Sequence, residues 1–145
     1  MIAIYAMCGI PGSGKTTLAT QLAEQHNAIV HSVDDIPGSW GSSDIDGKFR
    51  RQWIENIKAD LQSGKSVVCD SLALTIASRK WMLKELSGFN CEKILCIKAV
   101  PVEVCQQRNK NRNLKVSDEH ILLCASVLEP PTKEEGWDKI YVYKD

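Results

Sequence analysis

The nine residues from 9 to 17, Gly-Ile-Pro-Gly-Ser-Gly-Lys-Thr-Thr, have the residue types and spacing of a loop that binds phosphate groups. Glycines allow consecutive backbone N–H groups to turn toward one anion, and the N-terminus of a following helix adds partial positive charge. In such a loop Lys15 would reach the β- and γ-phosphates of a nucleotide, and the Thr16 hydroxyl would ligate Mg²⁺. The residues expected to form this nucleotide site are Pro11, Gly12, Ser13, Gly14, Lys15, Thr16 and Thr17.

Three carboxylates follow apolar runs of strand length, where they could act on a bound phosphate. Asp34 and Asp35 come after one run, and Asp70 ends another. A carboxylate at this point could take the proton of an acceptor hydroxyl, and we expect Asp34 to do so in preference to Asp35. Asp70 could orient Mg²⁺ through water or hold the acceptor. The alternatives are a turn-forming pair before Pro37 and a plain helix N-cap at Asp70.

A basic, asparagine-rich segment, Arg-Asn-Lys-Asn-Arg-Asn-Leu-Lys, runs from Arg108 to Lys115. One of its arginines, Arg112, could neutralise charge on a transferring phosphoryl group, and Arg108 could pack on adenine. The alternative is a solvated basic loop. Guanine-specific proteins usually carry Asn-Lys-x-Asp, whereas here Asn109-Lys110 precedes Asn-Arg, which argues against that class. The expected cofactors are ATP and Mg²⁺, and the preference for ATP over GTP stays open.

Short apolar runs alternate with helix-period segments, which predicts an α/β fold around a parallel sheet. The expected strands lie at about 2–8, 28–32, 66–69, 93–100 and 138–143. A helix should follow the glycine loop, a second should present an apolar stripe, and a third should cover about 76–87. A fourth should begin at Pro101, and a fifth, capped by Ser117 and stopped by Pro130-Pro131, should turn Leu128 inward. The expected architecture is a P-loop NTPase three-layer sandwich, a single domain over 1–145, with a short basic lid at about 108–117.

Composition sets limits on the class of protein. The chain has 18 basic and 18 acidic residues, which argues against a globally basic nucleic-acid binder but allows a local basic groove. The six cysteines form no CxxC pair, and five of them (8, 69, 96, 105 and 124) fall in apolar or helical patterns, so we expect small buried hydrophobes in a reducing compartment. No apolar run is long enough to span a bilayer, and the N-terminus is expected to be a strand. We therefore expect a cytoplasmic protein with no membrane association and no obligate protein partner.

The ordered set of motifs resembles the polynucleotide 5′-hydroxyl kinase-like family of small P-loop kinases. The resemblance covers nearly the whole chain and includes the glycine loop, Asp34-Asp35, Asp70 and Arg79. It continues through Val-Pro at 100–101, Gln-Arg-Asn at 107–109, Arg112, and Glu-Pro-Pro…Glu-Gly-Trp at 129–137. The resemblance implies that Lys15 and Thr16 contact phosphate and Mg²⁺, that Asp34 is the general base and that Arg112 is the lid arginine. It implies substrate-side positions for Asp35, Asp70 and Arg79.

The acceptor side of the family pattern is incomplete in this chain. An arginine usual three residues after the catalytic aspartate is replaced by Pro37, and an asparagine usual two residues after the third-strand aspartate is replaced by Leu72. Lys48, Arg50 or Arg51 could supply the missing positive charge. Three hypotheses follow: a kinase for the 5′-hydroxyl of a polynucleotide, which the resemblance favours; a kinase for the hydroxyl of a metabolite, nucleoside or antibiotic; and a non-catalytic nucleotide-binding switch.

Overall fold

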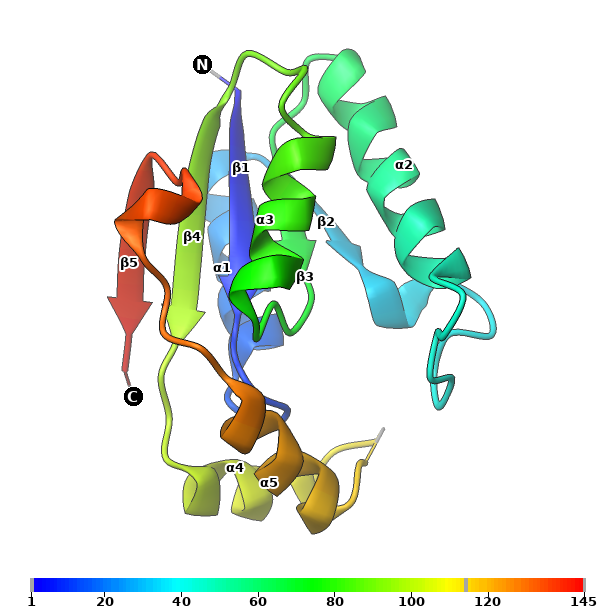
Figure 1. The fold of residues 1–145 in the computed structure, drawn as a ribbon, viewed down its shortest axis with the longest axis vertical. Helices are drawn as coiled ribbons and strands as arrows, with labels where there is room; N and C mark the ends of the chain where they lie inside the picture. The colour runs from blue at the N-terminus through cyan, green and yellow to red at the C-terminus, as the bar shows by residue number, and fades with distance from the viewer. Residues whose placement is uncertain (1, 114, 145) are drawn as a thin grey trace.

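The computed structural model describes residues 2–113 and 115–144, and its centre is a sheet of five parallel strands. The strand order is β2-β3-β1-β4-β5, which places the first strand in the middle (Figure 1). The strands are β1 (Ala3–Cys8), β2 (Ile29–Ser32), β3 (Val67–Asp70), β4 (Glu92–Lys98) and β5 (Lys139–Tyr143). Every residue of β1 is buried, as expected for a central strand with both faces covered.

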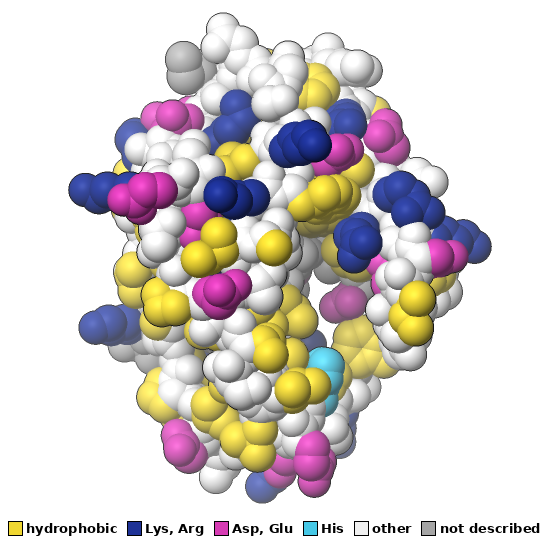
Figure 2. All heavy atoms as spheres, viewed as in Figure 1, with side chains coloured by type: hydrophobic (Ala, Val, Ile, Leu, Met, Phe, Trp, Pro, Cys, Tyr) yellow, Lys and Arg dark blue, Asp and Glu magenta, His cyan; other side chains and the backbone are white. Residues whose placement is uncertain are grey.

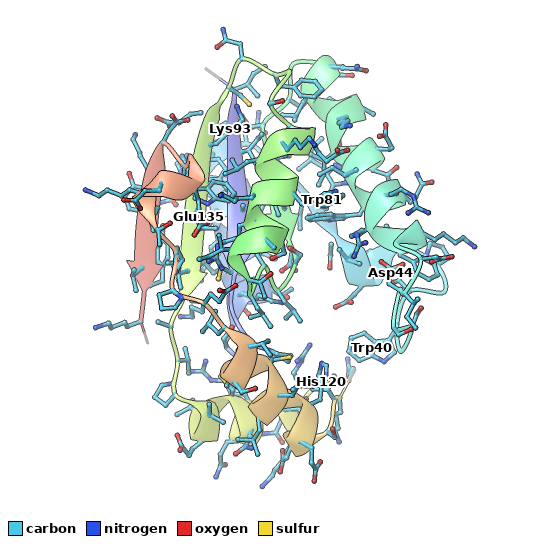
Figure 3. All side chains as sticks on the ribbon, in the orientation of Figure 1. Trp40, Asp44, Trp81, Lys93, His120 and Glu135 are labelled. Atoms are coloured by element: carbon cyan, nitrogen blue, oxygen red, sulfur yellow. The ribbon has the colours of Figure 1, made fainter. Side chains whose placement is uncertain are left out.

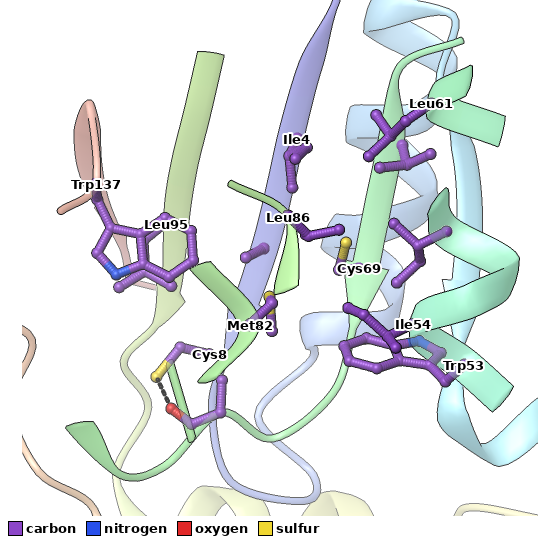
Figure 4. Packing of buried hydrophobic residues seen from close by; sticks show 14 residues of the cluster. Ile4, Cys8, Trp53, Ile54, Leu61, Cys69, Met82, Leu86, Leu95 and Trp137 are labelled. Carbon is purple, nitrogen blue, oxygen red and sulfur yellow. Dashed lines mark hydrogen bonds between the residues drawn. The ribbon is translucent and has the colours of Figure 1, made fainter. Parts of the chain in front are cut away.

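Helices cover both faces of the sheet, so the fold has three layers. On one face α1 (Lys15–His26) packs Leu18, Ala19 and Leu22 against the strands. On the other face α2 (Lys48–Gln62) and α3 (Ile76–Glu85) bury a larger core, part of which is seen in Figure 4. The α2 stripe of Trp53, Ile57 and Leu61 recurs every four residues, which turns one side of the helix toward the sheet.

A third, smaller core lies beyond the carboxyl ends of the strands, where α4 (Val102–Asn109) and α5 (Asp118–Val127) pack together (Figure 1). Its members come from the glycine loop, the segment after β3 and both helices: Ile10, Leu74, Cys105, Ile121 and Cys124. This core joins the phosphate loop to the helices on either side of the lid segment, residues 108–117.

The fold confirms the predicted α/β class, and the five strands lie where they were expected. Two details at the lid helices are wrong. Pro101 is the N-cap of α4 rather than its first residue. Helix α5 begins after the predicted Ser117 cap, whose hydroxyl accepts from the His120 N–H, but it ends at Val127, before the two prolines. Leu128 therefore lies outside the helix and is 38% exposed instead of turned inward.

The cysteines are free thiols, and five of the six are buried. Burial raises the pKa of Cys69 and of Cys96, so these thiols stay protonated and pack as small apolar groups. Within residues 2–113 and 115–144, no three His, Cys, Asp or Glu side chains gather into a metal-binding group. The same residues contain no helix with the length and apolar character needed to span a membrane.

Candidate active site

The glycine loop has the backbone conformation that a phosphate cradle needs. It connects the end of β1 to the start of α1, and Gly12 and Gly14 have φ of 85° and 90°, values that side chains disfavour. A Cβ on Gly12 would lie 2.4 Å from the carbonyl oxygen of Cys105 in α4, so the loop rests directly on that helix. Among the described residues no side chain caps the N-terminus of α1, which leaves its first N–H groups available to an anion.

We call the cavity over this loop the donor cleft. Its volume is about 300 Å³, and its lining consists of the loop and two lid-side arginines: Gly12, Gly14, Lys15, Thr16, Thr17, Arg108 and Arg112. Arg108 also supports the loop, because its Nη1 donates to the carbonyl oxygen of Ser13 over 3.1 Å. Within the loop, Ser13 is fully buried, whereas Pro11 lines a second cavity. Six of the seven predicted loop residues thus form or underlie the cleft.

Asp70 lies on the donor side of the site. The Thr16 hydroxyl donates to its Oδ2 over 3.1 Å, and Lys15 Nζ lies 3.5 Å from its Oδ1. The carboxylate is buried, and Oδ1 has no hydrogen-bond partner among the described residues despite the nearby ammonium. A threonine hydroxyl beside a buried carboxylate with an unused oxygen fits hydrated Mg²⁺, so Thr16 and Asp70 are the residues that would hold it. Asp70 is not a helix N-cap, since α3 is capped by Thr75.

A second and larger cavity adjoins the donor cleft, and we call it the acceptor cavity. Its volume is about 600 Å³, and it lies between the loop at 38–43 and the lid segment with the start of α5. Lys15 and Arg112 line both cavities. The remaining lining residues are Pro11, Asp34, Ser39, Trp40, Gly41, Ser42, Ser43, Leu72, Lys115, Val116, Ser117 and His120. The surface is visibly hollowed between the α2 side and the α5 side of the molecule (Figure 2).

The neighbouring residues Asp34 and Asp35 line different cavities. Asp34 lines the acceptor cavity, whereas Asp35 lines a different cavity of about 200 Å³ with Gln52, Trp53 and Asn56. Asp35 therefore does not line the acceptor cavity, and its substrate-side role stays a prediction. Desolvation raises the pKa of Asp34 and outweighs the opposing charges of Lys15 and Arg112. A carboxylate with a raised pKa is a stronger base, which suits proton transfer from a hydroxyl.

Arg112 lines both the donor cleft and the acceptor cavity. Its Nη1 is buried and has no hydrogen-bond partner within the described part of the chain. Burying a guanidinium nitrogen without a partner is costly, so this atom is placed for an anion that a ligand brings. The predicted lid arginine thus lies at the boundary between donor and acceptor.

Arg79 lies in the protein interior and lines neither cavity, whereas the family resemblance implies a substrate-side position for it. Its side chain is fully buried, and its Nε and Nη2 donate to the two oxygens of Glu135 over 2.7 and 3.1 Å. Nη1 donates to the Ala73 carbonyl and Nη2 also to the Glu129 carbonyl. With its donors directed at the protein, this side chain is structural.

Sequence reasoning missed several residues of the acceptor cavity. Trp40 reaches it from an irregular loop and His120 from α5, so the two side chains line the cavity from different segments (Figure 3). Lys115 supplies positive charge that was expected from α2. Arg50 instead lies over the Trp81 ring, and Arg51 donates to the Asp46 carbonyl. Only the polar, glycine-containing character of residues 38–43 marked this loop in the sequence.

Several solved structures superpose on this chain over most of its length. A candidate kinase from Chloroflexus aurantiacus superposes with a TM-score of 0.77 at 19% identity, covering 99% of this chain and 85% of the other. A gluconokinase from Sinorhizobium meliloti has a TM-score of 0.68 at 19% identity, with coverage of 98% and 82%. A chain of the Pnkp1/Rnl/Hen1 RNA repair complex has a TM-score of 0.75 at 18% identity, and the superposition covers 88% of this chain and 44% of the other.

At these identities the structural likeness shows a shared fold and no more. No functionally curated protein matches the sequence. The profile of the AAA domain family matches residues 4–131, which includes the phosphate loop, Asp34, Asp70 and the lid segment. The chain therefore belongs to the AAA domain family.

Proposed function

We propose that this chain is an ATP-dependent kinase that transfers the γ-phosphate to a hydroxyl group held in the acceptor cavity. The observation that carries the proposal is that two cavities share Lys15 and Arg112, while Asp34 lines only the acceptor side. A phosphoryl group crossing between them would pass between two cations and toward a carboxylate base. Phosphoryl transfer requires mainly such positioning and charge neutralisation.

Each side chain has a role that its position supports. The carboxylate of Asp34 accepts the proton of the acceptor hydroxyl as that oxygen bonds to the γ-phosphorus, and the bond to the β-phosphate oxygen breaks. Lys15 and Arg112 neutralise charge on the phosphoryl oxygens. Lys15 contacts Asp70 in this structure and would turn to the phosphates when nucleotide binds. Mg²⁺ held at Thr16 and Asp70 would supply further charge neutralisation on the β- and γ-phosphates.

A pair of isosteric variants tests the base. Asp34→Asn should lower ATP-dependent phosphorylation by about 10²–10⁴-fold while nucleotide affinity is retained. Asp35→Asn is the matched control, since the neighbouring residue lines a different cavity. Turnover is measured by ADP release, and affinity by nucleotide titration. If the two variants behave alike, Asp34 is not the base. ATP binding by the unchanged chain without any phosphate transfer would instead indicate a nucleotide-binding switch.

The geometry favours a small hydroxyl compound as the acceptor. The cavity volume of about 600 Å³ suits a small molecule, and its wall combines serine hydroxyls, one aromatic ring and one carboxylate. The basic residues at the start of α2 do not extend it into a groove, because Arg50 and Arg51 are engaged elsewhere. The neutral net charge of the chain agrees with this acceptor.

The 5′-hydroxyl of a polynucleotide is the second candidate. It is favoured by Trp40 and Lys115, because an aromatic ring and a cation together could hold a terminal nucleotide and its phosphate. A fold shared with a chain of an RNA repair complex is compatible with it.

Competition and salt distinguish the two acceptors. A 5′-hydroxyl oligonucleotide and a set of small compounds, including gluconate, sugars and nucleosides, are each supplied with γ-labelled ATP. A polynucleotide acceptor should lose affinity steeply between about 50 and 200 mM salt, whereas an uncharged small acceptor should not. Label on the oligonucleotide alone would refute the small-molecule assignment.

A further inference from the structure

The buried Arg79 binds three separate segments of the chain at once. Its guanidinium forms a two-pronged pair with Glu135, and its other contacts are the carbonyl oxygens of Ala73 and Glu129, at 2.8 and 2.9 Å. Burial opposes ionisation of Glu135, but hydrogen bonds from Arg79, Thr132 and Trp137 hold its pKa below the ordinary value. The pair is therefore charged and fixed in one geometry.

Ala73, which Arg79 holds, has a strained backbone. Its φ is 50°, in the left-handed region that non-glycine residues avoid. The Ala73 carbonyl accepts a second hydrogen bond from the Cys8 thiol over 3.3 Å (Figure 4). Such a conformation persists only when surrounding contacts over-determine it, and here they are a guanidinium and a thiol at the end of β1.

The strained segment, residues 71–75, connects the phosphate loop with the lid helices. Directly before Ala73, the Leu72 carbonyl accepts from the Gly9 N–H over 3.1 Å, at the start of the phosphate loop. Directly after it, the Leu74 carbonyl accepts from the Glu129 N–H over 2.8 Å, just beyond the end of α5. The Leu74 side chain packs in the small core with Ile10 of the loop and residues of α4 and α5.

We propose that Arg79 is a positioning residue, which holds residues 71–75 in their strained form and so fixes the phosphate loop relative to the lid helices. The inference rests on the proposed nucleotide site, and it assigns Arg79 no contact with substrate. Loss of the Arg79 hydrogen bond to the Ala73 carbonyl lets Ala73 relax toward an ordinary backbone conformation. The Leu72 contact to Gly9 and the Leu74 contact to Glu129 then loosen together.

The test is a rescue experiment with Mg²⁺ and a fluorescent ADP analogue as the probe. Arg79→Lys keeps the positive charge but loses the planar guanidinium that makes two parallel hydrogen bonds to Glu135. It should weaken binding of the analogue about tenfold, because the cost of holding one non-glycine residue in the left-handed conformation corresponds to about that factor in an equilibrium constant. Adding Ala73→Gly makes the left-handed conformation free of strain, so the double variant should recover most of the affinity. A purely stabilising role for Arg79 gives no such recovery.

Leu61→Ala is the control for stability. Leu61 is buried at the far end of α2, so this variant should melt at a lower temperature without a change in nucleotide affinity. If Arg79→Lys does not fold, Glu135→Gln weakens the same pair and is tested with and without Ala73→Gly. Unchanged affinity in the single variants, or a loss that Ala73→Gly does not restore, would overturn the proposal. Binding of the analogue needs no acceptor, so failure of the proposed kinase reaction would leave this result readable.

Discussion

Adding one methyl group at Gly12 tests how closely the phosphate loop rests on the lid helices. An alanine there meets two separate costs. Its φ of 85° lies in the left-handed region, which costs about 1–2 kcal/mol for a residue with a side chain. Its Cβ would lie 2.4 Å from the Cys105 carbonyl oxygen, a backbone atom that cannot turn aside, and such overpacking costs about 1–3 kcal/mol. The sum predicts that Gly12→Ala lowers the free energy of unfolding by about 2–5 kcal/mol.

Two other glycines separate these costs. Gly64 has φ of 79° but no atom within 4 Å of a built Cβ, so Gly64→Ala meets the conformational cost alone. Gly88 has neither a positive φ nor a close neighbour, so Gly88→Ala should leave stability unchanged or raise it slightly. The three variants should therefore melt in the order Gly12→Ala, Gly64→Ala, Gly88→Ala, from lowest to highest.

Chemical denaturation gives the free energies, and titration with nucleotide gives the effect on the site. Gly12→Ala should also weaken nucleotide binding, because the loop can avoid Cys105 only by moving out of its cradle conformation. If Gly12→Ala and Gly64→Ala lose equal stability, the close contact of the phosphate loop with α4 contributes nothing.

Two further predictions concern pH. Desolvation raises the pKa of Asp34 above its ordinary value of 3.8, and a general base must be deprotonated, so turnover should fall on the acid side at a pH above that value. A rate profile with its acid limb at or below the ordinary value would contradict this role. Glu135 has a lowered folded pKa, so its contribution to stability is present above its unfolded value of 4.5 and is lost as the pH falls through the folded pKa. Denaturation in this acid range should show a smaller pH dependence for Glu135→Gln than for the unchanged chain, and equal dependence would exclude the ion pair as its source.

The residues that line the donor cleft could be predicted because their signal in the sequence is local. The residues of the phosphate loop are contiguous, and the loop opens a helix directly after an apolar strand. Asp34 and Asp70 could be placed because parallel strands bring their carboxyl ends to one edge of the sheet. The orientation of Asp35 could not be predicted, since adjacent side chains of a turn can face different cavities.

The acceptor half depends on contacts between segments far apart in the sequence. Trp40 and His120 meet at one cavity only because the loop after β2 and helix α5 approach each other in the fold. The buried position of Arg79 could not be predicted for the same reason, because its partner Glu135 is 56 residues away and no local sequence pattern marks a buried ion pair. A motif alignment reports that an arginine is present but not whether it faces the ligand or the core.

In the proposed reaction a phosphoryl group passes from the donor cleft to a hydroxyl beside Asp34. The most direct measurement follows label from γ-labelled ATP in the presence of Mg²⁺ and the candidate acceptors, and identifies the product by mass. We expect a phosphate ester on an acceptor hydroxyl, formed by the unchanged chain and by Asp35→Asn but not by Asp34→Asn. Tight ATP binding with label released only as inorganic phosphate, or with no release at all, would contradict it.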